Sequence, residues 1–245
     1  MPNKSLERSF LVRVDECGQD GRASLSTLLN YCQESAWQHA ESLGLGREKL
    51  LSDGVAWVMT RLRVQIVAYP EPGDLVTVYT WPSAKDRYVA YRDFVLSGPN
   101  GELGRCTTAW VHMDIHERRM VLLESCDSMM KNPLARALEF TTRAVPRLRG
   151  SDRSMKFVTR RADLDVNGHV NNTRYVDYAL ESVPGHVSSQ VFLREMDVSF
   201  RHECMAHEKI ESLSQENTEK NGWIHMLKRL SDDTELIRAV TFWSS

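Results

Sequence analysis

Carboxylate, amide and imidazole side chains lie close together in residues 163–172, a combination that can act on a carbonyl group. Asp165, Asn167 and His169 occupy alternate positions in this run. A simpler interpretation is a surface turn, because Asp, Asn and Gly are the usual turn residues. The segment that follows favours the chemical interpretation.

Apolar residues after this run recur at the spacing of an amphipathic helix: Tyr175, Val176, Ala179, Leu180 and Val183. Asn171 or Asn172 is a suitable N-cap, because an Asn side-chain oxygen accepts from an unpaired backbone N–H. A helix N-terminus stabilises negative charge. The pattern therefore predicts a site at a helix start, where a carbonyl oxygen under attack would gain charge.

The composition is that of an ordinary globular protein. The chain has 245 residues, 42% of them hydrophobic, and a net charge of -2, so we expect neither nucleic acid nor membrane as its main partner. Residues 1–10 lack the apolar segment of a secretory signal, and no apolar run approaches the ~18 residues that cross a bilayer. An odd number of cysteines without a CxxC pair fits a reducing compartment (Cys17, Cys32, Cys106, Cys126 and Cys204). These features predict a cytoplasmic protein.

The two halves of the chain resemble each other. Phe10-Leu11-Val12-Arg13 corresponds to Phe157-Val158-Thr159-Arg160, and Gly21 to Gly168, at an offset of 168 minus 21, or 147 residues. Further on, Glu102-Leu103-Gly104-Arg105 corresponds to Glu235-Leu236-Ile237-Arg238 at an offset of 235 minus 102, or 133 residues. A repeat of this length indicates duplication of a whole domain.

Each half is predicted to contain a short strand, a helix and several long strands. In the first half the helix covers 24–43 and the strands 54–69, 74–84, 87–97 and 103–116. In the second half the helix covers 170–183 and the strands 190–204, 207–216, 222–231 and 235–244, with a hairpin turn at 217–221. This order predicts an α+β fold in which each antiparallel sheet wraps around a long helix.

The pattern resembles the hotdog fold, and nearly the whole chain resembles the plant-type acyl-acyl carrier protein (acyl-ACP) thioesterases, which have two tandem hotdog domains. The resemblance rests on residues 163–172 and on Phe200-Arg201-His202-Glu203-Cys204. This sequence departs from the family pattern at Gly168, where plant members usually have Gln. The resemblance implies an N-terminal hotdog that binds substrate without catalysing (1–126), a linker (127–155) and a catalytic C-terminal hotdog (156–245). Because the chain shows no plastid transit peptide, we expect a bacterial relative or a mature form.

The resemblance also implies a catalytic set, which consists of Asp165, Asn167, His169, Glu203 and Cys204. The repeat places Gly18, Asp20 and Arg22 opposite the first three of these residues, at the offset of 147. Glu203 corresponds to Tyr69 at an offset of 134, taken from Glu208 and Asp74. One active site per chain is therefore expected, in the second half.

The implied reaction is hydrolysis of a fatty acyl thioester by water, without a cofactor or a metal ion. The backbone N–H groups of Val170 and Asn171 are expected to receive the oxyanion. Asp165 is the better candidate for nucleophile or base and Glu203 for activating water, while Asn167 and His169 orient them.

An alternative makes Cys204 the nucleophile, with His169 and Asn167 as its partners. Glu203 beside it would oppose ionisation of the thiol. If both residues lie on a strand, they point to opposite faces, so only one of them faces the pocket. We expect that residue to be Glu203.

The expected partner is an acidic acyl carrier protein carrying a fatty acyl chain, bound by a monomer or a homodimer. The basic segment 143–161, with Lys85, Arg87 and Arg92, is a candidate docking surface. Trp57 and Met59 are candidates for the lining of an acyl tunnel. Two alternatives stay open at this point: an acyl-CoA thioesterase of the same fold, and a hotdog protein that binds acyl groups without turnover.

Overall fold

The computed structural model describes residues 4–123, 134–185, 192–217 and 221–244, which form two compact units, 1–140 and 141–245. Cys126, the first part of the expected linker and the tip of the expected 217–221 turn lie outside the described residues. No helix among the described residues is both long and apolar enough to cross a membrane.

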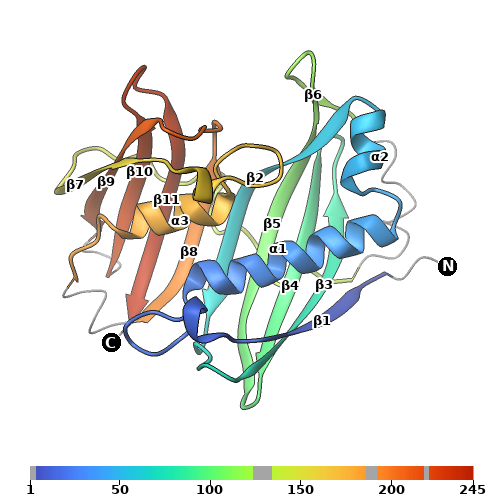
Figure 1. The fold of residues 1–245 in the computed structure, drawn as a ribbon, viewed down its shortest axis with the longest axis horizontal. Helices are drawn as coiled ribbons and strands as arrows, with labels where there is room; N and C mark the ends of the chain where they lie inside the picture. The colour runs from blue at the N-terminus through green and yellow to red at the C-terminus, as the bar shows by residue number, and fades with distance from the viewer. Residues whose placement is uncertain (1–3, 124–133, 186–191, 218–220, 245) are drawn as a thin grey trace. The chain divides into compact units, whose positions relative to one another are not determined.

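The first unit packs two helices against one antiparallel sheet (Figure 1). Its elements are β1 (Leu6–Leu11), α1 (Leu25–Ser42), α2 (Arg47–Ser52), β2 (Val55–Ile66), β3 (Leu75–Lys85), β4 (Val89–Gly98), β5 (Gly101–Asp114) and β6 (Met120–Val121). The strand order is β1-β3-β4-β5-β2, and β6 pairs with β5. Helix α1 begins where the sequence predicts, because Ser24 caps it by accepting from the N–H of Thr27.

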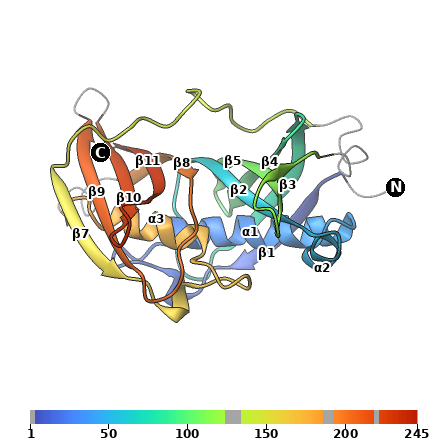
Figure 2. The same ribbon diagram turned by 90° about the horizontal axis from the view of Figure 1, so that it is seen from above.

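The second unit repeats this plan with a shorter helix. Its elements are β7 (Arg153–Val158), α3 (Asn172–Leu180), β8 (Phe192–Phe200), β9 (Lys209–Asn217), β10 (Gly222–Arg229) and β11 (Glu235–Ser244), with the strand order β8-β11-β10-β9-β7. Figure 2 shows α3 against one face of this sheet. Helix α3 has nine residues where the spacing predicts 170–183. Each unit is a helix packed on an antiparallel sheet, as the hotdog expectation requires.

The predicted repeat is visible in individual bonds. Leu164 forms a β-bridge with Val170, and 147 residues earlier Cys17 forms one with Ala23. Each bridge closes a loop with a glycine at positive φ, Gly21 in the first unit and Gly168 in the second. At the offset of 133, the ion pair of Arg105 with Glu102 corresponds to that of Arg238 with Glu235. In the same strands, the Trp110 indole donates to the Thr108 hydroxyl, and the Trp243 indole donates to the Thr241 hydroxyl.

Residues 134–140, inside the expected linker, cover the first sheet on the face opposite α1. Asp93 points to that face and is fully buried, and its carboxylate accepts from the N–H of Ala137 at 2.9 Å and from the hydroxyls of Ser83 and Thr107. The Trp81 indole donates to the carbonyl of Ala135 at 3.0 Å. A buried carboxylate needs such donors, so this segment belongs structurally to the first unit.

The neighbouring residue, Arg92, corrects one expectation about the basic surface. Its guanidinium is buried against α1, 3.0 Å from Nδ1 of His39 and 3.3 Å from the Thr80 hydroxyl. Burial lowers the pKa of Arg92 to about 10. Because β-strand neighbours alternate, Arg92 faces the helix while Asp93 faces residues 134–140 on the other side of the sheet, and Arg92 is not available for docking.

A buried carboxylate and a tyrosine anchor the loop before α3. Asp163, which is 1% exposed, accepts from the Tyr178 hydroxyl at 2.6 Å and from the N–H of Arg160 at 2.7 Å. Burial by itself would raise the pKa of Asp163, but these hydrogen bonds outweigh it and keep the pKa below its usual value. In the first unit, Tyr31 donates to the less buried carboxylate of Glu16 at 2.7 Å.

We expect Tyr178→Phe to lower the free energy of unfolding by roughly 1.5–3 kcal/mol, because it removes a bond to a buried carboxylate. The matched variant Tyr31→Phe should cost less, since Glu16 is more exposed than Asp163. Urea unfolding followed by circular dichroism measures both. An equal loss in the two variants would contradict the role of burial.

Candidate active site

The loop 164–170 is held in shape by its own backbone and by one carboxylate. The N–H of Asp165 donates to the carbonyl of His169 at 2.8 Å, and the N–H of Gly168 to the carbonyl of Asp165 at 3.0 Å. Oδ1 of Asp165 accepts from the N–H groups of Asn167 at 2.8 Å and His169 at 3.3 Å. Oδ2 lies 3.5 Å from the Asn167 amide nitrogen. Asp165 therefore organises the loop that carries the other two candidates.

The structure brings His169 and Glu203 together although 34 positions separate them in the sequence (203 minus 169). Nε2 of His169 lies 3.4 Å from Oε2 of Glu203, and the two side chains are 35% and 40% exposed. Both are reached by solvent and belong to the same unit. This pair is the centre of the candidate site.

Glu203 and Cys204 do not lie on a strand, and this expectation was wrong. Strand β8 ends at Phe200. The N–H groups of Arg201 and His202 both donate to the same carbonyl, that of Leu236, at 2.9 and 3.3 Å. The chain then leaves the sheet and forms the loop 201–208. Alternation of faces therefore does not decide between Glu203 and Cys204. Their separate environments decide instead.

Cys204 is fully buried, and its environment keeps it a thiol. Burial, followed by the hydrogen bond and negative charge of Glu208, raises the pKa of Cys204 to about 12. The thiol also lies 3.6 Å from the carbonyl of Met205. A nucleophilic cysteine needs the opposite surroundings, with positive charge and access to substrate.

The N–H groups of Val170 and Asn171 are already engaged, which corrects their expected role toward an oxyanion. Val170 donates to the carbonyl of Cys204 and Asn171 to the carbonyl of Asp163, both at 2.8 Å. The Asn171 side chain caps α3 by accepting from the N–H of Thr173 at 2.9 Å, as one predicted alternative has it. Within the described part of the chain, the Asn172 N–H, first in α3, has no acceptor.

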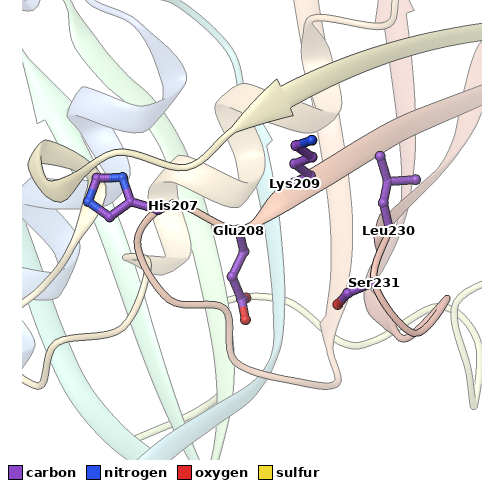
Figure 3. Close-up of a pocket in the computed structure, with 5 residues that line it drawn as sticks. All are labelled: His207, Glu208, Lys209, Leu230 and Ser231. Carbon is purple, nitrogen blue, oxygen red and sulfur yellow. The ribbon is translucent and has the colours of Figure 1, made fainter.

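An open pocket of about 390 Å³ adjoins the loop 201–208 (Figure 3). It is lined by His207, Glu208, Lys209, Leu230 and Ser231, and Figure 3 shows the side chains of His207 and Glu208 diverging from the start of β9. His207 has a φ of +68°, where the corresponding residue of the first unit is Gly73 with a φ of +90°. Sequence reasoning missed Glu208, although its match to Asp74 in the repeat was a usable signal.

The two candidate tunnel residues lie in β2 of the first unit. Trp57 is half-buried against a small core cluster of Leu45, Leu50, Ala90 and Leu123, and its ring centroid is 3.9 Å from that of His112. Met59 is buried. Burial by its neighbours lowers the pKa of His112 to about 4, so this histidine is neutral at ordinary pH.

Comparisons with known proteins match both units. The family model described as "Acyl-ACP thioesterase N-terminal domain" matches residues 3–126, and "Acyl-ACP thioesterase C-terminal domain" matches residues 148–245. The chain therefore belongs to the acyl-ACP thioesterase family.

Plant relatives cover nearly all of the chain. A chloroplastic palmitoyl-acyl carrier protein thioesterase of Gossypium hirsutum is 33% identical over 96% of this chain and 63% of its own length. Oleoyl-acyl carrier protein thioesterase 1 of Arabidopsis thaliana is 28% identical over 98% of this chain and 76% of its own length. The chain spans about three fifths of the length of several other curated relatives that it matches.

Solved structures share the fold over the full length. The 12:0-ACP thioesterase from Umbellularia californica superposes with a TM-score of 0.87 and 26% identity, covering 100% of this chain and 98% of that chain. An acyl-ACP thioesterase from Bacteroides thetaiotaomicron reaches the same TM-score of 0.87 at 20% identity, with 98% of each chain covered.

The Cys204 thiol should resist alkylation in the native protein. With a pKa of about 12 and full burial, it should react with iodoacetamide at pH 8 far more slowly than Cys17, which is partly exposed. Site-resolved mass spectrometry measures both rates in one sample. Faster labelling of Cys204 than of Cys17 would show a reactive thiol and revive the cysteine mechanism.

Proposed function

We propose that this protein hydrolyses fatty acyl thioesters carried on acyl carrier protein, releasing free fatty acid. The observation that carries the proposal is the 3.4 Å contact between His169 and Glu203, on two loops of the unit that matches the C-terminal family domain. A carboxylate beside an imidazole, both reached by solvent, is suited to remove a proton from water. The names of the relatives supply the substrate class.

In the proposed reaction, Glu203 takes a proton from water while the oxygen of that water bonds to the thioester carbonyl carbon. The resulting oxyanion collapses, the carbon–sulfur bond breaks, and the proton held by Glu203 passes to the leaving sulfur, which gives the free fatty acid and the thiol. His169 orients Glu203 and the substrate. Donors for the oxyanion are commonly worth ~3–4 kcal/mol each, and the Asn172 N–H at the start of α3 takes this role in our proposal.

Asp165 has two roles in the proposal. Its Oδ1 shapes the loop through the N–H groups of Asn167 and His169, while Oδ2 has the longer contact of 3.5 Å with the Asn167 amide. Oδ2, oriented by Asn167, is therefore the atom suited to act on the thioester. As a base it assists Glu203 in the one-step reaction above; as a nucleophile it would instead bond to the carbonyl carbon, the thiol would leave, and the Glu203-activated water would then cleave the acyl–Asp165 anhydride. Cys204 has no role as a nucleophile.

The first unit is proposed to bind the acyl chain without catalysing, as the domain expectation 1–126 has it. Its loop has the same backbone bonds as 164–170 but lacks the side chains. The N–H of Gly18 donates to the carbonyl of Arg22 at 2.8 Å, and Asp20 merely caps the N–H of Arg22 at 3.2 Å. Trp57 and Met59 are the proposed lining of the acyl site.

A panel of acyl-ACPs of increasing chain length, with matching acyl-CoAs, tests the function. The wild-type protein should release fatty acid fastest from ACP, with a peak at one chain length. Glu203→Gln and Asp165→Asn should each lower kcat by roughly 10²–10⁴-fold, the usual contribution of a general acid or base.

The matched control is Asp20→Asn in the corresponding loop of the first unit, which should keep the wild-type rate. Preference for the acyl-CoAs would keep the chemistry and change the carrier. Binding of acyl chains without any turnover would leave a binding protein and refute the proposed hydrolysis.

The basic segment 143–161 is the proposed docking surface for the carrier protein. Arg149 and Arg153 are exposed, whereas Arg160 is paired with Asp163 at 2.9 Å. Opposite charges across an interface mainly speed encounter and fix register.

Reversing both charges, Arg149→Glu with Arg153→Glu, should raise KM for acyl-ACP several-fold and leave short acyl thioesters without a carrier unaffected. Steady-state kinetics on both substrates measures the difference. An equal response of the two substrates would exclude docking at these residues.

A further inference from the structure

The loop that carries Glu203 and Cys204 is a modified copy of a simple turn in the first unit. In that turn the N–H of Glu71 donates to Oδ2 of Asp74 at 2.9 Å. In the second unit the N–H of Met205 donates to Oε2 of Glu208 at 3.0 Å. The backbone frame is also shared, because the carbonyls of Asp74 and Glu208 accept from equivalent residues of the two units, Val12 at 2.9 Å and Thr159 at 3.0 Å.

Three side chains around this loop exist only in the second unit. Thr159 replaces Val12, and its hydroxyl donates to the carbonyl of Met205 at 2.5 Å. Cys204 replaces Pro70, as the matching bonds from Val170 to Cys204 at 2.8 Å and from Ala23 to Pro70 at 2.9 Å show.

Arg229 is the third of these side chains. It pairs with Ile210, whose counterpart in the first unit is Val76. Thr77, the residue after Val76, pairs with Ser97, so Gly98 occupies the position of Arg229. The unit with the catalytic candidates has thus gained polar groups where the other unit has Val, Pro and Gly.

Glu208 joins these groups into one network. Besides accepting from the N–H of Met205, its carboxylate lies 3.5 Å from Nη1 of Arg229, and it helps to raise the pKa of the neighbouring Cys204 thiol. The same nitrogen of Arg229 lies 3.4 Å from the backbone carbonyl of Glu203. Asp232 holds the guanidinium in place with two bonds, at 3.0 and 2.9 Å.

The charge of Glu208 is maintained at neutral pH. Burial would raise its pKa, but the bonds from Cys204 and Met205 and the charge of Arg229 together lower the pKa below its usual value. Asp74 accepts from the N–H of Glu71 without such partners, because its side chain is shorter and proline occupies position 70. The longer side chain of Glu208 therefore makes contacts that the turn itself does not require.

We propose that Glu208 is a positioning residue for the hydrolysis, which fixes the Glu203 backbone beside His169 through Arg229. This inference rests on the proposed function. Beside this contact, the Cys204 thiol donates to the carbonyl of Met205 at 3.6 Å. Holding a base in place matters for the rate, because a displacement of about 1 Å can cost about 10²-fold.

The decisive variant is Glu208→Asp, which introduces the residue of the first unit. An aspartate there keeps the cap on Met205, as Asp74 keeps it on Glu71, but does not reach Cys204 and Arg229. We expect kcat on acyl-ACP to fall by about 10–100-fold with KM changed less than about two-fold. Wild-type kcat in this variant would overturn the proposal, because the cap alone would then suffice.

Glu208→Gln and Asp74→Asn form a matched pair that separates positioning from stability. Both remove the charge from an equivalent cap, so both should lower the melting temperature slightly, but only Glu208→Gln should lower kcat. A similar loss of kcat in the two variants would overturn the proposal. Combined with Glu203→Gln, the Glu208→Gln change should lower kcat no further, because its effect passes through Glu203.

Cys204 supplies a test that needs no enzymatic turnover. Glu208→Gln should speed alkylation of Cys204 at pH 8 at least several-fold, with Cys17 unchanged as the internal reference. Cys204→Ser, which keeps a donor, should retain more activity than Cys204→Ala. If the wild type lacks hydrolase activity, the labelling rates still test the network, so its failure is distinguishable from failure of the proposed function. An unchanged rate would refute the network.

Discussion

One backbone hydrogen bond joins the two loops on which the site depends. The N–H of Val170, at the end of the Asp165 loop, donates to the carbonyl of Cys204 at 2.8 Å, in the loop that follows β8. Both groups are buried, so breaking the bond would leave an unpaired donor and acceptor away from water. Because of this constraint, the side chains of His169 and Glu203 meet although they belong to distant segments.

The same bond exists in the first unit, between Ala23 and Pro70, without any catalytic side chain around it. The shared features are therefore structural: the positive-φ glycine, the capped helix start and the tyrosine bonded to a carboxylate of the preceding loop. The features that differ are Asp165, His169 and Glu203 against Gly18, Arg22 and Tyr69. The duplicated frame occurs twice, and the proposed catalytic side chains Asp165, His169 and Glu203 belong to one copy.

Comparison of the two copies also clarifies Cys204. In the sequence, a cysteine in the same half as His169 and Asn167 can be interpreted as a nucleophile. In the structure it is fully buried and donates to the carbonyl of Met205, and burial together with the nearby charge of Glu208 raises its pKa, so this environment holds it as a thiol. A small donor fits there where the first unit has Pro70, which can donate nothing.

Periodicity and turn residues determined the α+β class and the positions of nearly all strands, because apolar spacing and turn residues are local properties. The similarity of the two halves at fixed offsets determined the tandem repeat. The Asp165 loop and an N-cap at Asn171 or Asn172 were also local and were predicted, and the structure selects Asn171. Only the tertiary structure decided that Glu203 and Cys204 leave the sheet, that the N–H groups of Val170 and Asn171 are already bonded, and that Arg92 is buried. These outcomes depend on partners far away in the sequence, such as Leu236 for the end of β8, and no local pattern records them.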